Sequence, residues 1–141
     1  MTRLDCTTPV ALMEGRMRAL ERGDFGLIYD SYHRQAPFLG HFPDKAEYLD
    51  FADRQLRGIA LTGWRILRRR ERAGDEVEIL LWMRVGTGPA AQDLFELARL
   101  IDTEHGWRYH SAQKLTREDY PGPAELIDFE HFDQAALKIR F

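Results

Sequence analysis

The sequence holds a single cysteine, Cys6, among its 141 residues. One cysteine excludes an internal disulfide and a zinc site built from cysteines, and it is typical of a reducing compartment, so we expect a cytoplasmic location. No stretch approaches the roughly 20 consecutive apolar residues of a membrane helix, which predicts that the protein does not bind a membrane. The first ten residues also lack the apolar core of a signal peptide.

The sequence also lacks the motifs of phosphate-binding loops, of nucleophilic catalysis and of metal sites. The short glycine cluster at 86–88 is followed by neither a helix nor a lysine, so it is not a phosphate-binding loop, and no nucleophile elbow occurs. Four histidines fall on separate predicted elements, without the spacing of metal ligands: His41, His105, His110 and His131. We therefore expect no metal site and no cofactor.

The charge balance argues against nucleic acid as a partner, because a formal net charge of −3 leaves no general excess of positive charge. One stretch is nevertheless rich in arginine: Arg65, Arg68, Arg69, Arg70 and Arg72. Glutamates lie within this stretch or opposite it in the predicted sheet: Glu71, Glu76 and Glu78. We interpret the stretch as a salt-bridged hairpin tip in preference to a phosphate-binding patch.

Residues 58–115 predict four consecutive antiparallel strands folded as two hairpins. In the clearest strand, 76–87, apolar residues recur at every second position and form one fully apolar face. Residues 58–72 form its partner through a turn at 73–75. Gly63 within this partner indicates a bulge or bend, which would curl the sheet.

With a three-residue loop in each hairpin, opposite charges pair with each other across the two strands, and apolar side chains pair with apolar side chains. In the first hairpin the predicted pairs are Arg72 with Glu76, Arg70 with Glu78, and Ile66 with Trp82. In the second hairpin, strands 93–103 and 107–115 pair Asp102 with Arg108 and Ile101 with Tyr109. This register places Arg99 on the apolar face with Tyr109, and Glu96 on the opposite, solvated face.

Three helices are predicted before the sheet. The first begins after the capping hydroxyl of Thr8, with proline in its first turn, and ends at Gly23. A second short helix, 25–32, begins after Asp24. Residues 33–42 contain several helix breakers and are predicted to be irregular.

A third helix, 45–57, follows Asp44 and Glu47, which have the spacing of a capping box. After the sheet, residues 124–141 fit two patterns. The helical pattern comprises Leu126, Phe129, Phe132 and Ala136, and the strand pattern comprises Leu137, Ile139 and Phe141. In either form the apolar groups of this stretch must dock, on the same domain or on a second copy.

The chain length predicts one domain of the α+β class. We divide it into an N-terminal tail (1–8), a body (9–115) and a C-terminal docking segment (116–141). In the body, three helices pack on a curved four-stranded antiparallel sheet. A curled sheet that closes over a helix makes a cone with an open mouth, so we expect a pocket.

Several short matches resemble one known family, the YchJ-type domain that accompanies SEC-C zinc modules. The matching residues are Leu12, Met13, Arg16, Gly23, Asp24, Tyr32, His33, Glu96, Arg99, Leu100, Trp107 and Tyr109. Two positions depart from the family pattern, since Ala98 replaces a serine and Glu14 replaces an arginine. The cysteine-rich zinc segments of the family are absent as well.

The resemblance implies the nuclear transport factor 2-like (cystatin-like) roll, a cone shared by ketosteroid isomerases, dehydratases and modules for binding or dimerisation. Such a fold does not by itself imply a function. It gives the expectation of a cone-shaped domain whose role resides in or around the hollow.

The most suggestive cluster is Tyr29, Asp30, Tyr32 and His33. A carboxylate and an imidazole three residues apart on one helical turn can touch, and they could act as a base with an orienting partner. The alternative is that His33 only bonds the last carbonyls of its helix, where its charge is favourable.

Arg99 is expected on an apolar face, where a buried cation needs an acidic partner or an anionic ligand. The partner favoured for a structural ion pair is a helix carboxylate such as Asp30 or Glu14. Trp107 and Tyr109, with Trp64 and Trp82, either form an aromatic pocket or belong to the core, which is the commoner outcome.

These features lead to a first hypothesis, a domain that binds a small molecule or a partner protein in or around its cone. The pocket residues would be Tyr29, Asp30, Tyr32, His33, Arg99, Trp107 and Tyr109. The alternative is a small isomerase, dehydratase or hydrolase, with Asp30 or His33 as base and Arg99 or Tyr109 as electrostatic support. A filled cone that serves only as an interaction module is the third possibility, and a homodimer through the sheet or the C-terminal segment is a further expectation.

Overall fold

The computed structural model describes residues 3–134. It has the predicted α+β class, with one antiparallel sheet in the order β1-β2-β3-β4. The helices are α1 (Pro9–Arg22), α2 (Phe25–Asp30), α3 (Pro37–His41), α4 (Lys45–Gln55) and α5 (Phe129–Asp133). The strands are β1 (Leu61–Ala73), β2 (Glu76–Val85), β3 (Gln92–Thr103) and β4 (Gly106–Thr116). Single-turn helices lie at η1 (Gly88–Ala90) and η2 (Ala124–Leu126).

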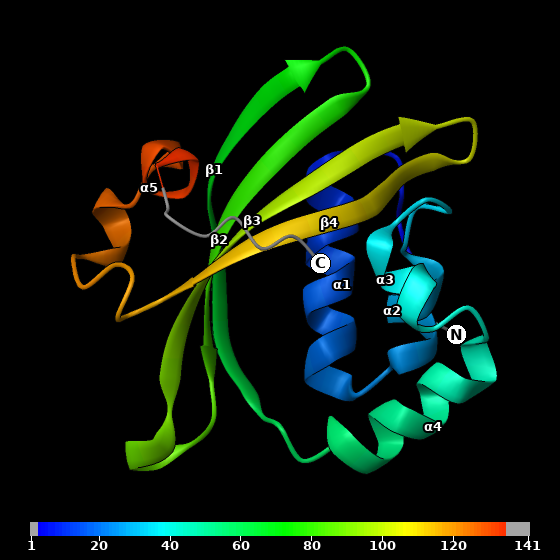
Figure 1. The fold of residues 1–141 in the computed structure, drawn as a ribbon, viewed down its shortest axis with the longest axis horizontal. Coiled ribbons are helices and arrows are strands. Elements are labelled where there is room, and N and C mark those ends of the chain that lie inside the picture. Colours follow the sequence, from blue (N-terminus) through cyan, green and yellow to red (C-terminus); the bar gives the residue numbers. More distant parts are fainter. Residues whose placement is uncertain (1–2, 135–141) are drawn as a thin grey trace.

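The two faces of the sheet are covered by different parts of the chain. Figure 1 shows α1 along one face of the bent sheet, with α2, α3 and α4 beyond it, and η2 and α5 on the opposite face. The C-terminal segment therefore docks on its own domain as far as residue 134. Within it, the helical pattern is present at α5. Ala136 and the predicted strand residues Leu137, Ile139 and Phe141 lie outside the described residues.

Local signals set the helix starts as predicted. The Thr8 hydroxyl accepts a hydrogen bond from the Ala11 amide at 3.0 Å and caps α1. Gly23 ends α1 in the left-handed conformation, at φ 71°. The carboxylates of Asp24 and Asp44 cap α2 and α4 in the same way as Thr8 caps α1.

The ends of the second and third predicted helices, and the loop between them, differ from the prediction. α2 ends at Asp30 and not near Tyr32, because Tyr32 forms a bridge with Tyr109 beside β4. α4 also ends slightly earlier than predicted. The stretch 33–42 is not irregular throughout, since it contains α3, which has Pro37 in its first turn, where a missing N–H costs nothing.

The first hairpin keeps one predicted pair. Arg70 lies opposite Glu78 as predicted, and the two side chains form an ion pair at 2.8 Å. The other two predictions are wrong: Ile66 pairs with Leu81, Trp82 with Arg65, and Glu76 with Ala73 instead of Arg72. β1 contains three register shifts, one of them beside Gly63 as predicted. Each extra residue at a bulge moves the following pairs, so a single loop length could not give the register.

The second hairpin is also registered differently. Its turn comprises only Glu104 and His105, because Thr103 pairs with Gly106. The predicted pairs Asp102–Arg108 and Ile101–Tyr109 are wrong, and the structure has Asp102–Trp107, Ile101–Arg108 and Leu100–Tyr109 in their place. A further shift between Arg99 and Leu100 leaves Arg99 opposite Ser111.

These register changes correct the predicted faces of β3 and β4. Tyr109 packs with α1 on one side of the sheet, where its hydroxyl donates to Glu96 at 3.0 Å. Glu96 is buried and not solvated. Arg99 lies two residues after Leu97 and so shares its face, which is the one that packs against the C-terminal segment, opposite α1. Arg99 and Tyr109 therefore do not share a face.

Each face of the sheet has its own apolar core. The core beneath α1 contains Leu12, Met13, Met17, Val77, Ile79, Leu81, Met83, Ala98, Leu100, Tyr109 and Ala112. The core beneath the C-terminal segment contains Leu80, Phe95, Leu97, Leu115, Tyr120, Ile127 and Phe132. A third cluster joins α2 to α4 through Phe25, Tyr48 and Ala52. The space between α1 and the sheet is thus packed with side chains.

The N-terminal residues, expected to form a tail, contact the core of the domain through two side chains. Leu4 and Cys6 pack on the core beneath α1, and the Cys6 carbonyl accepts from the Trp107 amide at 2.8 Å. This contact requires a close approach to Gly106. A Cβ at that position would lie 2.7 Å from the Cys6 oxygen, and Gly106 has φ +99°.

Replacing Gly106 by alanine is therefore expected to reduce the free energy of unfolding by about 2 kcal/mol, because strained backbone and the clash with Cys6 act together. Urea unfolding followed by circular dichroism measures the change. The matched control is Gly40→Ala, since nothing lies within 4 Å of that added Cβ. Equal stability of the two variants would show that the N-terminal residues do not constrain the turn.

Two further features of the fold bear on binding. None of the helices within residues 3–134 is long and apolar enough to cross a bilayer. The edge strand β1 carries bulges and arginines, devices that discourage pairing with the edge of another sheet.

Candidate functional site

A pocket of about 330 Å³ opens beside the C-terminal end of α2. The helical side contributes Tyr29, Asp30, Tyr32, His33, Arg34 and Leu39. The β3–β4 hairpin contributes Thr103, Glu104, His105 and Arg108. We call this the hairpin pocket. Four of the sequence-predicted site residues, Tyr29, Asp30, Tyr32 and His33, line it together.

Backbone hydrogen bonds hold the helical side of the pocket against the sheet. The Tyr109 amide donates to the Ser31 carbonyl, and the His33 amide donates to the Tyr109 carbonyl, both at 2.8 Å. Residues 31–33 thus add a short bridge to the edge of β4. This bridge fixes Tyr32 and His33 beside the hairpin and covers part of the β4 edge.

Tyr32 is held among other rings. Its ring stacks on Phe38, with centroids 4.3 Å apart and planes 10° apart, and meets Tyr109 edge to face at 5.4 Å. The Arg16 guanidinium carbon lies 3.7 Å from the Tyr109 ring centre and 4.9 Å from that of Tyr32. These contacts pre-organise the aromatic wall of the pocket.

Behind this wall lies a buried polar cluster. Arg16 donates to the Ser31 hydroxyl and, at 3.5 Å, to the Ile28 carbonyl. The Tyr109 hydroxyl donates to Glu96, and the Lys114 ammonium lies 3.9 Å from the same carboxylate. A buried cation therefore lies over the Tyr109 ring, and a buried carboxylate accepts a hydrogen bond from its hydroxyl.

The ionisation of this cluster follows from its surroundings. Burial and the Glu96 carboxylate together raise the pKa of Tyr109 well above its ordinary value, so the phenol stays protonated and can donate. Burial alone would lower the pKa of Arg16, but Tyr32, Tyr109 and Glu96 offset it, and the pKa of Arg16 rises. The guanidinium thus keeps its charge.

The charged side chains that line the hairpin pocket balance in number, Arg34 and Arg108 against Asp30 and Glu104, and Lys45 beside Asp30 adds one positive charge. The Asp30 carboxylate is neutralised by Lys45 at 2.9 Å, and Glu104 lies 3.4 Å from the His105 ring. Arg34 and Arg108 make no ion pair with any carboxylate among residues 3–134. Two guanidinium groups beside tyrosine rings provide donors for an anion and apolar surface for a planar group.

His33 is fixed as a hydrogen-bond donor. The Gln35 amide donates to Nδ1 of His33 at 3.0 Å, so the neutral ring carries its proton on Nε2. Burial, Arg34 and Arg99 lower the pKa of His33, which keeps the ring neutral at neutral pH. Asp30 bonds Lys45 and not His33, so the predicted carboxylate–imidazole contact does not form.

The remaining predicted site residues lie elsewhere. Arg99 donates to Glu76 on β2 at 2.8 Å, and not to Asp30 or Glu14. Its Nε has no hydrogen-bond partner within the described range. Trp107 packs at the margin of the core beneath α1, and Tyr109 is buried behind Tyr32.

The four aromatic residues pack on the cores, the commoner of the two expected outcomes, and do not form one pocket. Trp64 packs on the α1 side and donates to Glu21 at 2.9 Å. Trp82 packs on the opposite side with the C-terminal core. Two aromatic residues that the sequence placed together are thus separated by the sheet.

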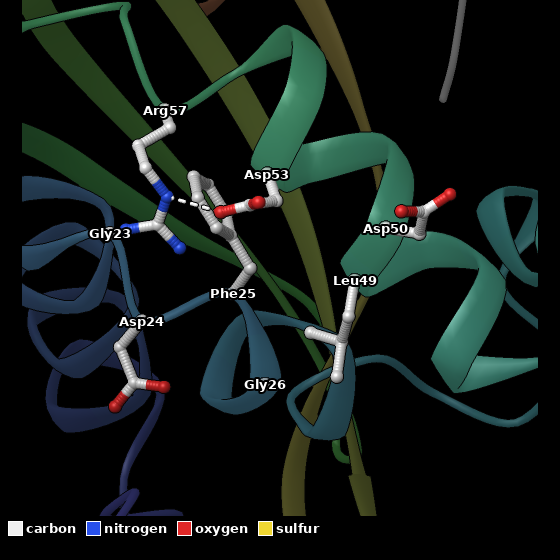
Figure 2. Close-up of a pocket in the computed structure, with 8 residues that line it drawn as sticks. All are labelled: Gly23, Asp24, Phe25, Gly26, Leu49, Asp50, Asp53 and Arg57. Atoms are coloured by element: carbon white, nitrogen blue, oxygen red, sulfur yellow. Dashed lines mark hydrogen bonds and ion pairs between the residues drawn. The ribbon is translucent and has the colours of Figure 1, made fainter.

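A second depression, of about 460 Å³, lies between the α1–α2 turn and α4 (Figure 2). Figure 2 shows the ion pair between two of its lining residues, Arg57 and Asp53, whose charged atoms lie 2.5 Å apart. Asp24 caps α2 and Asp50 pairs with Arg54, so its carboxylates already have partners. No group of three or more potential metal ligands occurs anywhere in residues 3–134. This depression therefore offers less to a ligand than the hairpin pocket.

Sequence reasoning missed several contributors to the hairpin pocket. Arg34 and Arg108 reach it from the loop and from the second hairpin, and no local pattern marks them. Arg16 did leave a signal, because it lies within the apolar stripe formed by Leu12 and Met13 on α1, at a spacing that faces the core.

Comparison with protein-family models, with curated proteins and with solved structures finds no match for this sequence. Fold and site together define an α+β protein with two packed cores and a small aromatic and basic surface pocket.

Proposed function

We propose that this protein is a binding domain that takes a small anionic ligand with a planar apolar part in the hairpin pocket. The observation that carries the proposal is the composition of the pocket. Arg34 and Arg108 lack carboxylate partners in the described chain, and His33 adds an N–H donor beside the held ring of Tyr32. Such groups suit a carboxylate or phosphate attached to a ring.

We further propose that the domain has the nuclear transport factor 2-like fold and belongs to its YchJ-type family. Support comes from the order of elements, in which helices precede a bent antiparallel meander, and from α1 lying along one face of that sheet. The residues of the resemblance also cluster, since Arg16, Tyr32, Glu96 and Tyr109 form one connected group. With the space beneath α1 filled, the ligand site lies at the margin of the cone.

The enzymatic alternative has less support. A general base needs a free lone pair near its substrate. Nδ1 of His33 already accepts from Gln35, and Asp30 is held by Lys45. Arg99, its expected electrostatic support, is engaged with Glu76.

The proposal predicts that 4-hydroxybenzoate, a planar aromatic carboxylate, binds with a dissociation constant of the order of 1 mM, as befits a small ligand in an open site. Two-dimensional NMR of the full chain should show shifts centred on residues 29–34 and 103–108. The double variant Arg34→Leu with Arg108→Leu is expected to weaken binding at least tenfold, because it removes both guanidinium groups.

The matched control replaces two arginines remote from the pocket, Arg18 and Arg54, by leucine, and should bind like the wild type. Benzyl alcohol, which lacks the carboxylate, serves as the control ligand. Equal binding of both ligands, or shifts centred on other elements, would exclude the anionic site.

A further inference from the structure

The C-terminal segment covers the sheet face opposite α1, and two of its apolar side chains insert into the core there. Ile127 and Phe132 are fully buried. They pack with Leu80, Phe95, Leu97 and Leu115 in the second core. By contrast, Leu126, the residue before Ile127, is 66% exposed. The segment 124–133 thus contributes two fully buried side chains to the core, packs Ala124 and Phe129 partly against it, and leaves Glu125, Leu126, Glu130 and Asp133 exposed.

A row of arginines on β1 holds the acidic side of this segment. Arg65 lies 3.9 Å from Glu125, and Arg68 lies 3.8 Å from Asp128. The fork of Arg70 makes two hydrogen bonds to Asp133, at 2.9 and 3.0 Å. The arginine-rich stretch predicted as a salt-bridged tip therefore finds many of its acids in the C-terminal segment, far away in sequence.

The segment is attached by side chains and not by the sheet ladder. Arg68 donates to the Ile127 carbonyl at 3.0 Å, and the Gln113 amide donates to the Phe132 carbonyl at 2.9 Å. Within residues 3–134, no backbone-to-backbone hydrogen bond joins 124–133 to a strand. The segment can consequently leave the face without breaking any pairing of the strands.

From this arrangement we infer that the face is a docking groove for an acidic peptide segment of a partner protein, which residues 124–133 occupy in cis. The partner segment would carry two apolar anchors five residues apart, like Ile127 and Phe132, with carboxylates placed to meet the β1 arginines. Recognition of acidic motifs by arginine rows, with apolar anchors for specificity, is an established mode of peptide binding.

Residues 124–133, which occupy the groove, lower its apparent affinity for a partner peptide. A tethered segment competes at an effective concentration in the millimolar range, so a partner binds well only when the tethered segment is weakened or the partner fits better. The charges of Glu125 and Asp133 can be changed to weaken the docking of the segment. Their ion pairs with Arg65 and Arg70 hold the segment but are not part of the apolar core.

The test uses the full chain with Glu125→Lys and Asp133→Lys, which reverse two exposed charges and leave both anchors in place. A fluorescein-labelled peptide of residues 123–134 is titrated, and its anisotropy is followed at low salt. We expect the variant to bind at least tenfold more tightly than the wild type, since its own segment is loosened. Binding should weaken as salt rises.

Two controls define specificity. The variant Asp50→Lys with Asp53→Lys also reverses two exposed carboxylates that pair with arginines, and it should bind the peptide like the wild type. A peptide with serine in place of Ile127 and Phe132 should not bind. Failure of the loosened variant to bind, while it still melts cooperatively, would overturn the inference.

A second measurement covers the case in which the charge-reversed chain does not fold. In the wild type, the Gln134 amide, which bonds Glu130 at the end of α5, should exchange with deuterium faster than β3 amides, because the segment opens locally. Exchange at the rate of β3 would overturn the inference. A dimer at high concentration that exchanges this segment would identify a second copy as the occupant and overturn the assignment to a partner protein.

Discussion

Replacing Arg16 by methionine is expected to lower the free energy of unfolding by about 3 kcal/mol, because it removes a buried cation and leaves the groups around it without their partner. The guanidinium lies over the Tyr109 ring and close to that of Tyr32, and it bonds Ser31 and the Ile28 carbonyl. Methionine fills a similar volume, so the decrease in the free energy of unfolding comes more from the lost charge and hydrogen bonds than from lost packing. Urea unfolding of the full chain measures it.

The control for this experiment is Arg18→Met on the same helix, because Arg18 is 57% exposed and lies 3.9 Å from Glu14. That change should cost less than about 0.5 kcal/mol. Combining Arg16→Met with Glu96→Gln tests the cluster as a unit. The double variant should lose less stability than the sum of the single variants, because Glu96 is a buried charge that Arg16 helps to neutralise. Additive losses would contradict that coupling.

Replacing Phe132 by alanine is expected to cost about 3 to 4 kcal/mol, the usual range for removing a fully buried aromatic ring. Phe132 has no exposed surface and closes the core beneath the C-terminal segment. Its carbonyl also accepts from the buried Gln113 side chain, so displacement of α5 would leave that amide without its partner. Thermal and urea unfolding give the change.

The matched control is Leu126→Ala in the same segment. Leu126 is 66% exposed, and its truncation should change stability by less than about 0.5 kcal/mol. A loss below 1 kcal/mol for Phe132→Ala would show that the C-terminal segment does not stabilise the sheet. The two variants together therefore measure what docking of this segment contributes.

The fold was predictable wherever neighbouring residues decide the structure. The hydroxyl of Thr8 and the carboxylates of Asp24 and Asp44 satisfy free amides within their own helical turns. A cap of this kind depends on three or four residues, so the sequence carries the information. The alternation in β2 predicted its strand for the same reason.

Registers could not be predicted because bulges depend on what packs above the sheet. The two-residue turn set Tyr109 opposite Leu100, on the α1 side where Arg16 covers its ring, and the register shift at Arg99 comes only after this pair. Cys6, from the N-terminal residues, approaches Gly106 at the end of that turn. Neither contact is visible in the sequence of the hairpin itself.

The sequence by itself determined the α+β class, the starts of three helices and the local cluster from Tyr29 to His33. Tertiary structure alone decided that Arg34 and Arg108 join this cluster in a pocket, that Arg99 pairs with Glu76, and that the β1 arginines meet the acids of the C-terminal segment. The physical reason is distance along the sequence, because helix caps and the alternation of apolar and polar residues in strands depend on residues only a few positions apart. Ion pairs and cores join residues that only the folded chain brings together.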